Sequence, residues 1–186
     1  MSPRFDMPQI EILEVRSRAR LEQAFAIRRA VFVQEQGVSE ALEIDGRDAE
    51  AQHLLALHDG EPVGTLRLRW VEDGRVAKVE RVAVLARARG AKIGRTLVEA
   101  ALTLARAAGA DAAMLHAQTT VEAFYARLGF VAFGPEFIED GIPHVVMRLS
   151  LCGNTVGVAM RHGDRTRPGD PSIIGHSGRP PSERLN

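Results

Sequence analysis

ERVAVLARARGAKIGRT, residues 80–96, is the stretch that decides how this chain folds. It predicts an apolar strand, a basic loop with two glycines, and the first turn of a helix. Such a turn carries unpaired backbone N–H groups and a partial positive charge, which together stabilise an anion. Gly90 and Gly94 let the backbone approach that anion closely. The pattern therefore predicts a site for an anion such as phosphate, with added charge from Arg87, Arg89, Lys92 and Arg95.

Two well-known phosphate loops do not match this stretch. A P-loop has four residues between its glycines and then Lys-Ser/Thr, whereas here three residues separate Gly90 from Gly94, and Arg95-Thr96 follows. The dinucleotide pattern G-x-G-x-x-G is also missing. A solvated basic turn between two elements explains the loop equally well when it is taken alone, so the rest of the chain has to decide.

Composition sets the limits on fold and location. The chain has 186 residues, of which 45% are hydrophobic and 26% charged, and its formal net charge is zero. That length suits one domain with one core, and zero net charge argues against general nucleic-acid binding, which needs an excess of basic residues. Cys152, the single cysteine, cannot form an internal disulfide, and no apolar stretch is long enough for a signal sequence or a membrane span. We therefore expect a cytoplasmic protein that binds neither nucleic acid nor membranes.

Hydrophobic spacing predicts the elements of the first half. A strand over residues 10–16 is followed by a helix over about 18–34, whose apolar residues recur at helical spacing. Residues 37–52 are acidic and poor in large apolar side chains, so they are expected to form a loop or a short helix at the surface. Alternation with period two over residues 53–84, interrupted by two Asp-Gly turns, then predicts three consecutive antiparallel strands.

The second half continues with helices and strands in alternation. A helix is predicted from Ile93 to Ala108, with Gly109 as its left-handed C-cap. The remaining elements are a short buried strand over 112–117, a capping box at 119–122 that opens a helix ending at Gly129, and strands over 130–133 and 144–149.

The end of the chain has a different composition. Residues 153–186 are dense in Gly, Pro, Arg and Ser, and only Ile173 and Ile174 offer apolar side chains for a core. Such a segment cannot offset its own ordering entropy. We therefore predict a folded domain over residues 1–151 and a disordered tail over 152–186; a tail that binds acidic partners is the alternative.

These elements, together with two local motifs, resemble the GNAT acyltransferase family. FYARLGF, residues 124–130, is similar to the family's FY-x-x-LGF signature, and RGAKIG, residues 89–94, is similar to its pyrophosphate loop, R/Q-x-x-G-x-G/A. Lys92 stands where the family has its middle glycine, and Gln118 stands where it often has Asn. The resemblance covers about residues 10–150.

Further motifs are similar to the ElaA/YjcF-type branch of bacterial members. The resemblance implies an α/β (α+β) fold, in which a mixed, mostly antiparallel central sheet is flanked by helices and a CoA-binding β-loop-α unit lies in the middle. The motifs that carry the likeness to the branch are Val31–Gln36, Glu43-x-Asp45-x-x-Asp48, His116-Ala117-Gln118 and Gly141-Ile142-x-His144.

The resemblance also implies acetyl-CoA as co-substrate. Backbone groups of Val82 and Val84 would meet the pantetheine amides, and residues 89–96 would hold the pyrophosphate. No spacing of histidines or carboxylates in the chain makes a metal site. The full set of expected cofactor residues is Val82, Ala83, Val84, Arg87, Arg89, Gly90, Ala91, Lys92, Ile93, Gly94, Arg95, Thr96 and Gln118.

Transfer of an acetyl group to an amine needs two proton handlers. An amine with a pKa of about 10 is protonated at neutral pH and must lose a proton, and the departing thiolate gains from receiving one. The resemblance makes Tyr125 the general acid; an aromatic that packs under the cofactor is the alternative. Glu80, which we expect on the same strand face as Val82, is the preferred base, although an ordinary strand-surface carboxylate explains it nearly as well. His116 is the competing base, or else a hydrogen-bonded core histidine.

The acceptor side is defined by charge alone. His144 and the acidic set Glu43, Asp45 and Asp48 can line a pocket for a cationic amine; a solvated acidic loop explains the carboxylates equally well. The prediction is an acetyl-CoA-dependent N-acetyltransferase that acts, as a monomer or homodimer, on a small-molecule or protein amine. A non-catalytic acyl-CoA-binding or regulatory module of the same fold is the alternative, and an unrelated anion-binding domain is a third reading.

Overall fold

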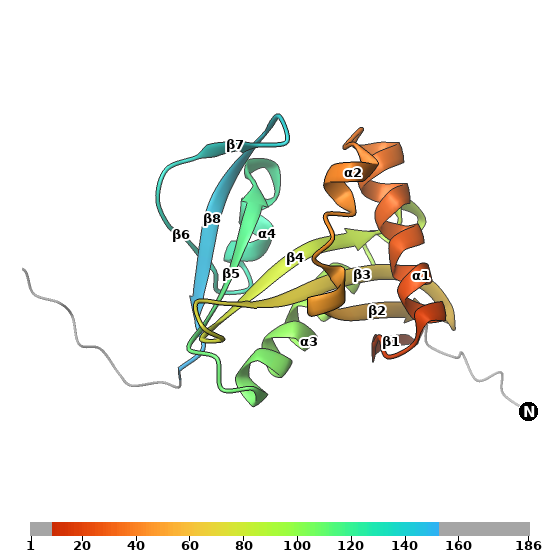
Figure 1. Ribbon diagram of the computed structural model, residues 1–186, viewed down its shortest axis with the longest axis horizontal. Coiled ribbons are helices and arrows are strands. Elements are labelled where there is room, and N and C mark those ends of the chain that lie inside the picture. The colour runs from red at the N-terminus through yellow and green to blue at the C-terminus, as the bar shows by residue number, and fades with distance from the viewer. Residues whose placement is uncertain (1–8, 153–186) are drawn as a thin grey trace, which may run out of the picture. The chain divides into compact units, whose positions relative to one another are not determined.

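The computed structural model describes residues 9–152, which form one mixed sheet with helices packed on it (Figure 1). Its strands are β1 (Ile10–Glu14), β2 (Gln52–His58), β3 (Glu61–Val71), β4 (Val76–Val84), β5 (Ala112–Gln118), β6 (Val131–Ala132), β7 (Phe137–Glu139) and β8 (Ile142–Ser150). Their order in the sheet is β1-β2-β3-β4-β5-β8-β6, and β7 pairs with β8. Only β4 and β5 are parallel among the pairs in this part of the chain. The predicted fold class is confirmed.

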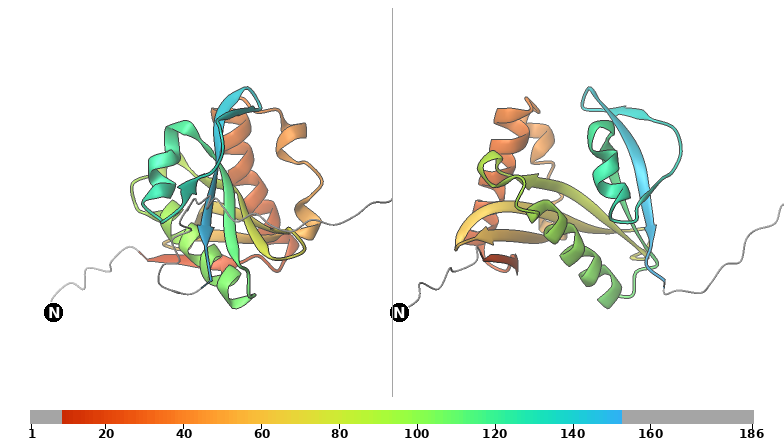
Figure 2. Two further views of the ribbon diagram at one scale, coloured as in Figure 1. Left: turned by 90° about the vertical axis from the view of Figure 1, so that its left-hand side faces the viewer. Right: turned by 180° about the vertical axis from the view of Figure 1, so that it is seen from behind.

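Helices cover both faces of this sheet. They are α1 (Arg18–Arg28), the π-helix η1 (Arg29–Glu35), α2 (Glu40–Glu43), α3 (Ile93–Ala107) and α4 (Glu122–Ala126), with 3-10 turns at Asp48–Glu50, Ala86–Ala88 and Thr119–Val121. Alternate side chains of β2 enter two different apolar cores. Leu54 packs in the core that contains Leu97 of α3, here called the α3 cluster. Leu55 packs in the core that contains Ile27 of α1, here called the α1 cluster. Figure 2 shows α1 and α3 on opposite sides of the strands. Burial on both faces explains why β2 reads as a continuous apolar run.

The strands and the long helix agree with the sequence predictions. β1, the three consecutive strands β2 to β4, α3, β5 and β8 all occur where spacing placed them. The helix predicted over 18–34 is also present, but from Arg29 to Glu35 it continues as the π-helix η1. There the Gln36 N–H donates to the Val31 carbonyl at 3.2 Å, which is the wider i to i−5 spacing.

Two local predictions in the second half were wrong. The capping box at residues 119–122 does not form, because Thr119–Val121 makes a separate 3-10 turn and α4 begins only at Glu122, with no side-chain cap. The helix also ends at Ala126 rather than at Gly129. β7 was not predicted, because a strand of three residues is too short to show a period.

A β-bulge in β4 changes which side chains face which helix. Arg81 and Val82 together lie opposite Leu66, and Arg81 has a positive φ of 54°. Such a bulge shifts the alternation of side chains by one residue. Val79 packs with the α3 cluster before the bulge, and Val82 does so after it. The expectation that Glu80 and Val82 share a face is therefore wrong, because the bulge places them on opposite faces.

The two parallel strands are paired only where they begin. Val76–Lys78 pairs with Ala112–Met114, after which β4 continues along β3 and β5 continues along β8. Within residues 9–152, the facing edges of β4 and β5 have no partner strand beyond these pairs. Backbone N–H and C=O groups along these edges are thus available to a ligand.

Gly64 in β3 lets the start of α3 lie close against the sheet. A Cβ at this position would meet Ile93 Cγ2 at 3.0 Å and Leu97 Cδ1 at 3.1 Å. We expect Gly64→Ala to lower the free energy of unfolding by about 1–3 kcal/mol, the usual cost of overpacking, measured by chemical denaturation. The matched control is Gly94→Ala, whose Cβ would meet its nearest neighbours at an ordinary 3.7 Å. A larger loss of stability in the control than in Gly64→Ala would contradict this reading.

The described chain ends one residue after Leu151, whose side chain is buried against the core. The predicted disordered tail, residues 152–186, lies outside the described residues apart from Cys152, and the boundary at residue 151 stays a prediction. Between residues 9 and 152, no helix has both the length and the apolar character that a membrane span requires.

Candidate functional site

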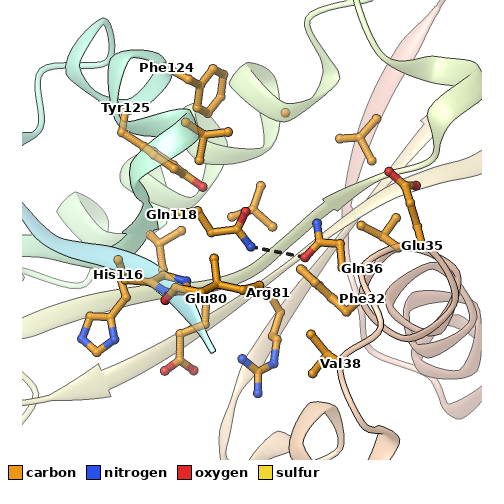
Figure 3. A pocket seen from close by; sticks show the side chains of 18 of the residues that line it. Phe32, Glu35, Gln36, Val38, Glu80, Arg81, His116, Gln118, Phe124 and Tyr125 are labelled. Atoms are coloured by element: carbon orange, nitrogen blue, oxygen red, sulfur yellow. Dashed lines mark hydrogen bonds between the residues drawn. The ribbon is translucent and has the colours of Figure 1, made fainter. Parts of the chain in front are cut away.

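A pocket of about 630 Å³ opens where β4 and β5 diverge (Figure 3). Its walls come from β4, β5, the start of α3, α4, the end of η1, and the turn between β7 and β8. Eight of the predicted cofactor residues line it: Val82, Val84, Arg89, Gly90, Lys92, Ile93, Gly94 and Gln118. The other five, which do not line this pocket, are Ala83, Arg87, Ala91, Arg95 and Thr96.

The basic glycine stretch at residues 87–96, here called the anion loop, has the backbone conformation that the sequence pattern predicts. Gly90 has a φ of 87°, and Lys92, the N-cap of α3, has a φ of 63° in the left-handed region. The N–H groups of a helix's first turn have no intrahelical partner, and here no side chain caps them either. Lys92 thus occupies a position whose conformation favours glycine, at a cost of roughly 1–2 kcal/mol. This conformation explains why the family pattern has a glycine there.

The outer residues of the loop have structural partners. Arg95 pairs with Glu99 at 2.7 Å, and Thr96 donates its hydroxyl to the Lys92 carbonyl at 3.2 Å. Ala83 packs in the α1 cluster, on the face away from α3. The structure therefore does not bring these predicted cofactor residues into the pocket.

Arg89 is held by a carboxylate on the opposite wall. Its two terminal nitrogens meet the two carboxylate oxygens of Glu35 at 2.7 and 2.8 Å, and its Nε donates to the Val84 carbonyl at 3.0 Å. The hydrogen bond from Arg89 lowers the pKa of Glu35. A forked pair of this kind is the geometry with which arginine also binds phosphate.

The end of the π-helix also reaches across to β5. Gln36 Oε1 accepts a hydrogen bond from Gln118 Nε2 at 3.2 Å, and this bond crosses the pocket in Figure 3. Phe124 and Tyr125 lie on one side of it, whereas His116 lies on the other. Glu35 and Gln36 therefore connect the N-terminal helices to the loop after β4, at Arg89, and to β5, at Gln118. Irregular π turns often occur at functional sites.

Tyr125 is packed by the motif in which it lies. Its ring makes edge contacts with Phe124 at 4.9 Å and Phe130 at 6.0 Å, and Gly129, with a φ of 92°, turns the chain so that Phe130 can return. The hydroxyl points into the pocket toward Gln118 (Figure 3). Burial raises the pKa of Tyr125 to about 12, so the phenol is neutral at physiological pH.

His116 lies against a carboxylate that the sequence did not single out. Its Nδ1 is 3.1 and 3.3 Å from the two carboxylate oxygens of Glu139, and both residues line the pocket. The hydrogen bond to His116 lowers the pKa of Glu139. Glu139 was missed because it lies 23 residues away from His116, in a strand too short to be recognised.

Glu80 also lines the pocket, but cations surround it. Its carboxylate accepts from Arg67 Nε at 3.0 Å and pairs with Lys78 Nζ at 3.1 Å. Burial opposes its charge, but Arg67, Lys78 and Arg69 outweigh burial and lower the pKa of Glu80. A carboxylate stabilised in this way is a weak proton acceptor.

The predicted acidic set is bound up in ion pairs. Glu43 is 2% exposed and contacts Arg28 Nε at 2.5 Å; burial raises its pKa although arginines surround it. Asp45 forms two bonds with Arg67, at 2.7 and 2.8 Å, which lower its pKa, and it does not line the pocket. The expectation of an acidic stretch at the surface is wrong for Glu43, because it neutralises a buried arginine.

The remaining acceptor-side residues come from the β7–β8 hairpin. His144, predicted for this side, lines the pocket and donates from Nδ1 to the Ile142 carbonyl at 2.8 Å. Asp140, in the turn, is exposed and also lines the pocket. Among residues 9–152, no group of three or more histidine, cysteine or acidic side chains is arranged to hold a metal ion.

Comparison with known proteins assigns the chain to a family. The model of the acetyltransferase (GNAT) domain matches residues 15–151, and the chain belongs to this family. The uncharacterized N-acetyltransferase YjcF of Bacillus subtilis is 40% identical over 129 residues, which are 68% of this chain and 90% of YjcF.

Two solved structures extend the comparison. Escherichia coli ElaA is 30% identical with a TM-score of 0.66, over 76% of this chain and 99% of ElaA. An acyl-CoA N-acyltransferase from Pseudomonas aeruginosa is 32% identical with the same TM-score, over 76% of this chain and 99% of that one. The predicted likeness to the ElaA/YjcF-type branch of the family is confirmed.

Proposed function

We propose that this protein is an acetyl-CoA-dependent N-acetyltransferase, which transfers an acetyl group to a primary amine of a small molecule or protein by direct attack. The observation that carries the proposal is the pocket itself, which brings an uncapped helix start and a tyrosine hydroxyl to the gap between two diverging strands. We propose further that it acts in the cytoplasm, as a monomer or homodimer, and without a metal.

Acetyl-CoA would use the two features that the strands and the loop provide. The pyrophosphate would lie at the start of α3, where Gly90 and Lys92 turn the backbone toward it. The pantetheine amides would bond to the edge of β4 that no strand covers, at Val82 and at Val84, whose carbonyl also accepts from Arg89 Nε, and the thioester would then lie near Tyr125. Holding amine and thioester together in this way can supply roughly 7–11 kcal/mol.

The chemistry needs one proton acceptor on the acceptor side. The amine nitrogen forms a bond with the thioester carbon, the C–S bond breaks, and CoA leaves as a thiolate, while the proton of the amine passes to a base. His116 is better suited than Glu80, because a neutral imidazole presents an unprotonated ring nitrogen that can accept a proton, whereas three cations stabilise the charge of Glu80. Glu80 then stays ionised among its cations and holds Arg67 and Lys78 in place beside the pocket.

Tyr125 would stabilise the departing sulfur by donating a hydrogen bond. A phenol with a pKa of about 12 is a much weaker acid than a thiol, whose pKa is about 8.5. Full transfer of the phenol proton to the thiolate is therefore unfavourable, but a donor already aimed at the developing charge lowers the barrier.

Calorimetric titration of acetyl-CoA into the full chain tests the cofactor half of this proposal. We expect one site per chain, competition by free CoA, and no comparable signal with adenosine, which lacks the pyrophosphate and pantetheine. The absence of acetyl-CoA binding would contradict both the enzyme and the non-catalytic acyl-CoA-binding module.

Glu35→Gln is expected to tighten acetyl-CoA binding. The Glu35 carboxylate occupies the two terminal nitrogens of Arg89, and the variant leaves them free for a phosphate. An exposed ion pair is worth at most about 1 kcal/mol, so the dissociation constant should fall by up to about fivefold. Glu99→Gln removes the partner of Arg95 outside the pocket and is the matched control, with no change expected. Weaker binding by Glu35→Gln would show that the ion pair supports the site instead.

A further inference from the structure

We propose that Glu139 is a positioning residue that makes His116 the base of the reaction, an inference that rests on the proposed function. The two side chains come from β7 and β5, and each is partly exposed to the same pocket. The contact between His116 and Glu139 therefore joins two walls of the pocket, β5 and the β7–β8 hairpin.

Strand alternation places His116 where a base is needed. Along β5 the side chains of Ala113, Leu115 and Ala117 are buried in the α3 core. His116 and Gln118 therefore lie on the other face of the strand, which borders the pocket. His116 is thus a pocket residue and not a core histidine.

The hairpin brings Glu139 to this face. Asp140 and Gly141, with φ values of 53° and 78°, form the tight turn between β7 and β8. Phe137 packs edge-on against the His116 ring at 5.1 Å, which fixes the plane of the imidazole. Glu139, two residues further along the same strand, then meets Nδ1.

A carboxylate next to Nδ1 determines where the imidazole carries its proton. An ionised carboxylate can only accept, so Nδ1 must be the protonated nitrogen, and Nε2 of the neutral ring is left as the acceptor. When Nε2 takes the proton from the attacking amine, the negative charge of Glu139 stabilises the imidazolium. A carboxylate in this position orients the histidine for catalysis without itself touching the substrate.

Other charged groups share this side of the pocket and do not replace Glu139. Lys78, Glu80 and Arg81 come from β4, Glu43 comes from α2, and Asp140 and His144 come from the hairpin. Lys78 pairs with Glu80, and Arg81 pairs with Glu43. Within the part of the chain that the structure describes, Glu139 is the carboxylate in hydrogen-bond contact with His116.

Glu139→Gln tests the inference by kinetics. We expect kcat to fall by about tenfold to a hundredfold, with little change in KM for acetyl-CoA, because removing a base entirely costs roughly 10²- to 10⁴-fold. Glu136→Gln, an exposed glutamate of the same segment, is the matched control and should behave as wild type.

Nitrogen-15 NMR of His116 gives a second readout that does not need turnover. In the wild type the neutral ring should carry its proton on Nδ1 and leave Nε2 unprotonated, and Glu139→Gln should show a mixture of the two tautomers. An unchanged tautomer together with unchanged kcat would overturn the inference while the acetyltransferase proposal stands. If the wild type transfers no acetyl group, the proposed function fails, and the tautomer measurement still decides whether Glu139 orients His116.

Discussion

Tyr125→Phe is expected to lower kcat by roughly 10²- to 10³-fold, the usual cost of removing one donor from a developing negative charge. Phenylalanine keeps the ring that packs against Phe124 and Phe130. Affinity for acetyl-CoA and the melting temperature should therefore change little. Turnover and calorimetry on the same preparation provide the measurement.

The high pKa of Tyr125 adds a pH prediction. Burial raises this pKa to about 12, so the hydroxyl keeps its proton throughout an assay from pH 6 to about 10. No loss of rate from ionisation of Tyr125 is expected in that range.

The control for Tyr125→Phe is Phe124→Leu, which changes a neighbouring ring without removing a hydroxyl. Wild-type turnover in Tyr125→Phe would show that the residue only packs beneath the ligand.

Arg67→Ala is expected to lower the free energy of unfolding by about 3–5 kcal/mol, because it leaves three partly buried carboxylates without the buried cation that they share. Arg67 is 1% exposed and bonds to Asp45, Asp48 and Glu80. Urea denaturation at neutral pH measures the loss. Arg16→Ala is the control, because Arg16 pairs with Glu14 at the surface and should change stability by less than about 1 kcal/mol.

The ion-pair cluster of Arg67 with Asp45, Asp48 and Glu80 also predicts how the stability of the fold depends on pH. The pKa values of Asp45, Asp48 and Glu80 are all lowered in the folded protein. Groups with lowered pKa values stabilise the fold above their unfolded pKa values, near pH 4, and this contribution is lost as pH falls through the folded values. Wild type should therefore lose more stability than Arg67→Ala on acidification below about pH 4. Parallel curves for the two proteins would contradict this account of the cluster.

Local periodicity was sufficient to predict most of the fold. The apolar spacing of α3 and the Asp-Gly turns between β2, β3 and β4 are properties of short stretches, so they could be read without a structure. The bulge at Arg81 could not, because it depends on the register between β4 and β3. For that reason the sequence assigned Glu80 to the wrong face.

The candidate site was predicted less completely than the fold, and for a related reason. Its tyrosine and anion loop lie in continuous motifs, whereas Glu139, Arg67 and Glu35 matter through partners that are 13 to 54 residues away. The acidic stretch at residues 40–50 shows most clearly how partners that are distant in the sequence are missed. Composition alone indicated a solvated loop, because the arginines that neutralise it lie on other elements.

The most direct test of the central claim is amine-dependent release of CoA thiol by the full chain. Acetyl-CoA is incubated with a panel of primary amines that includes small diamines, amino acids and peptides, and the acetylated amine is identified by mass spectrometry. We predict that thiol release depends on at least one amine and matches the amount of acetylated product. Acetyl-CoA that binds but yields no acetylated amine across the panel would contradict the claim and identify a non-catalytic acyl-CoA-binding module.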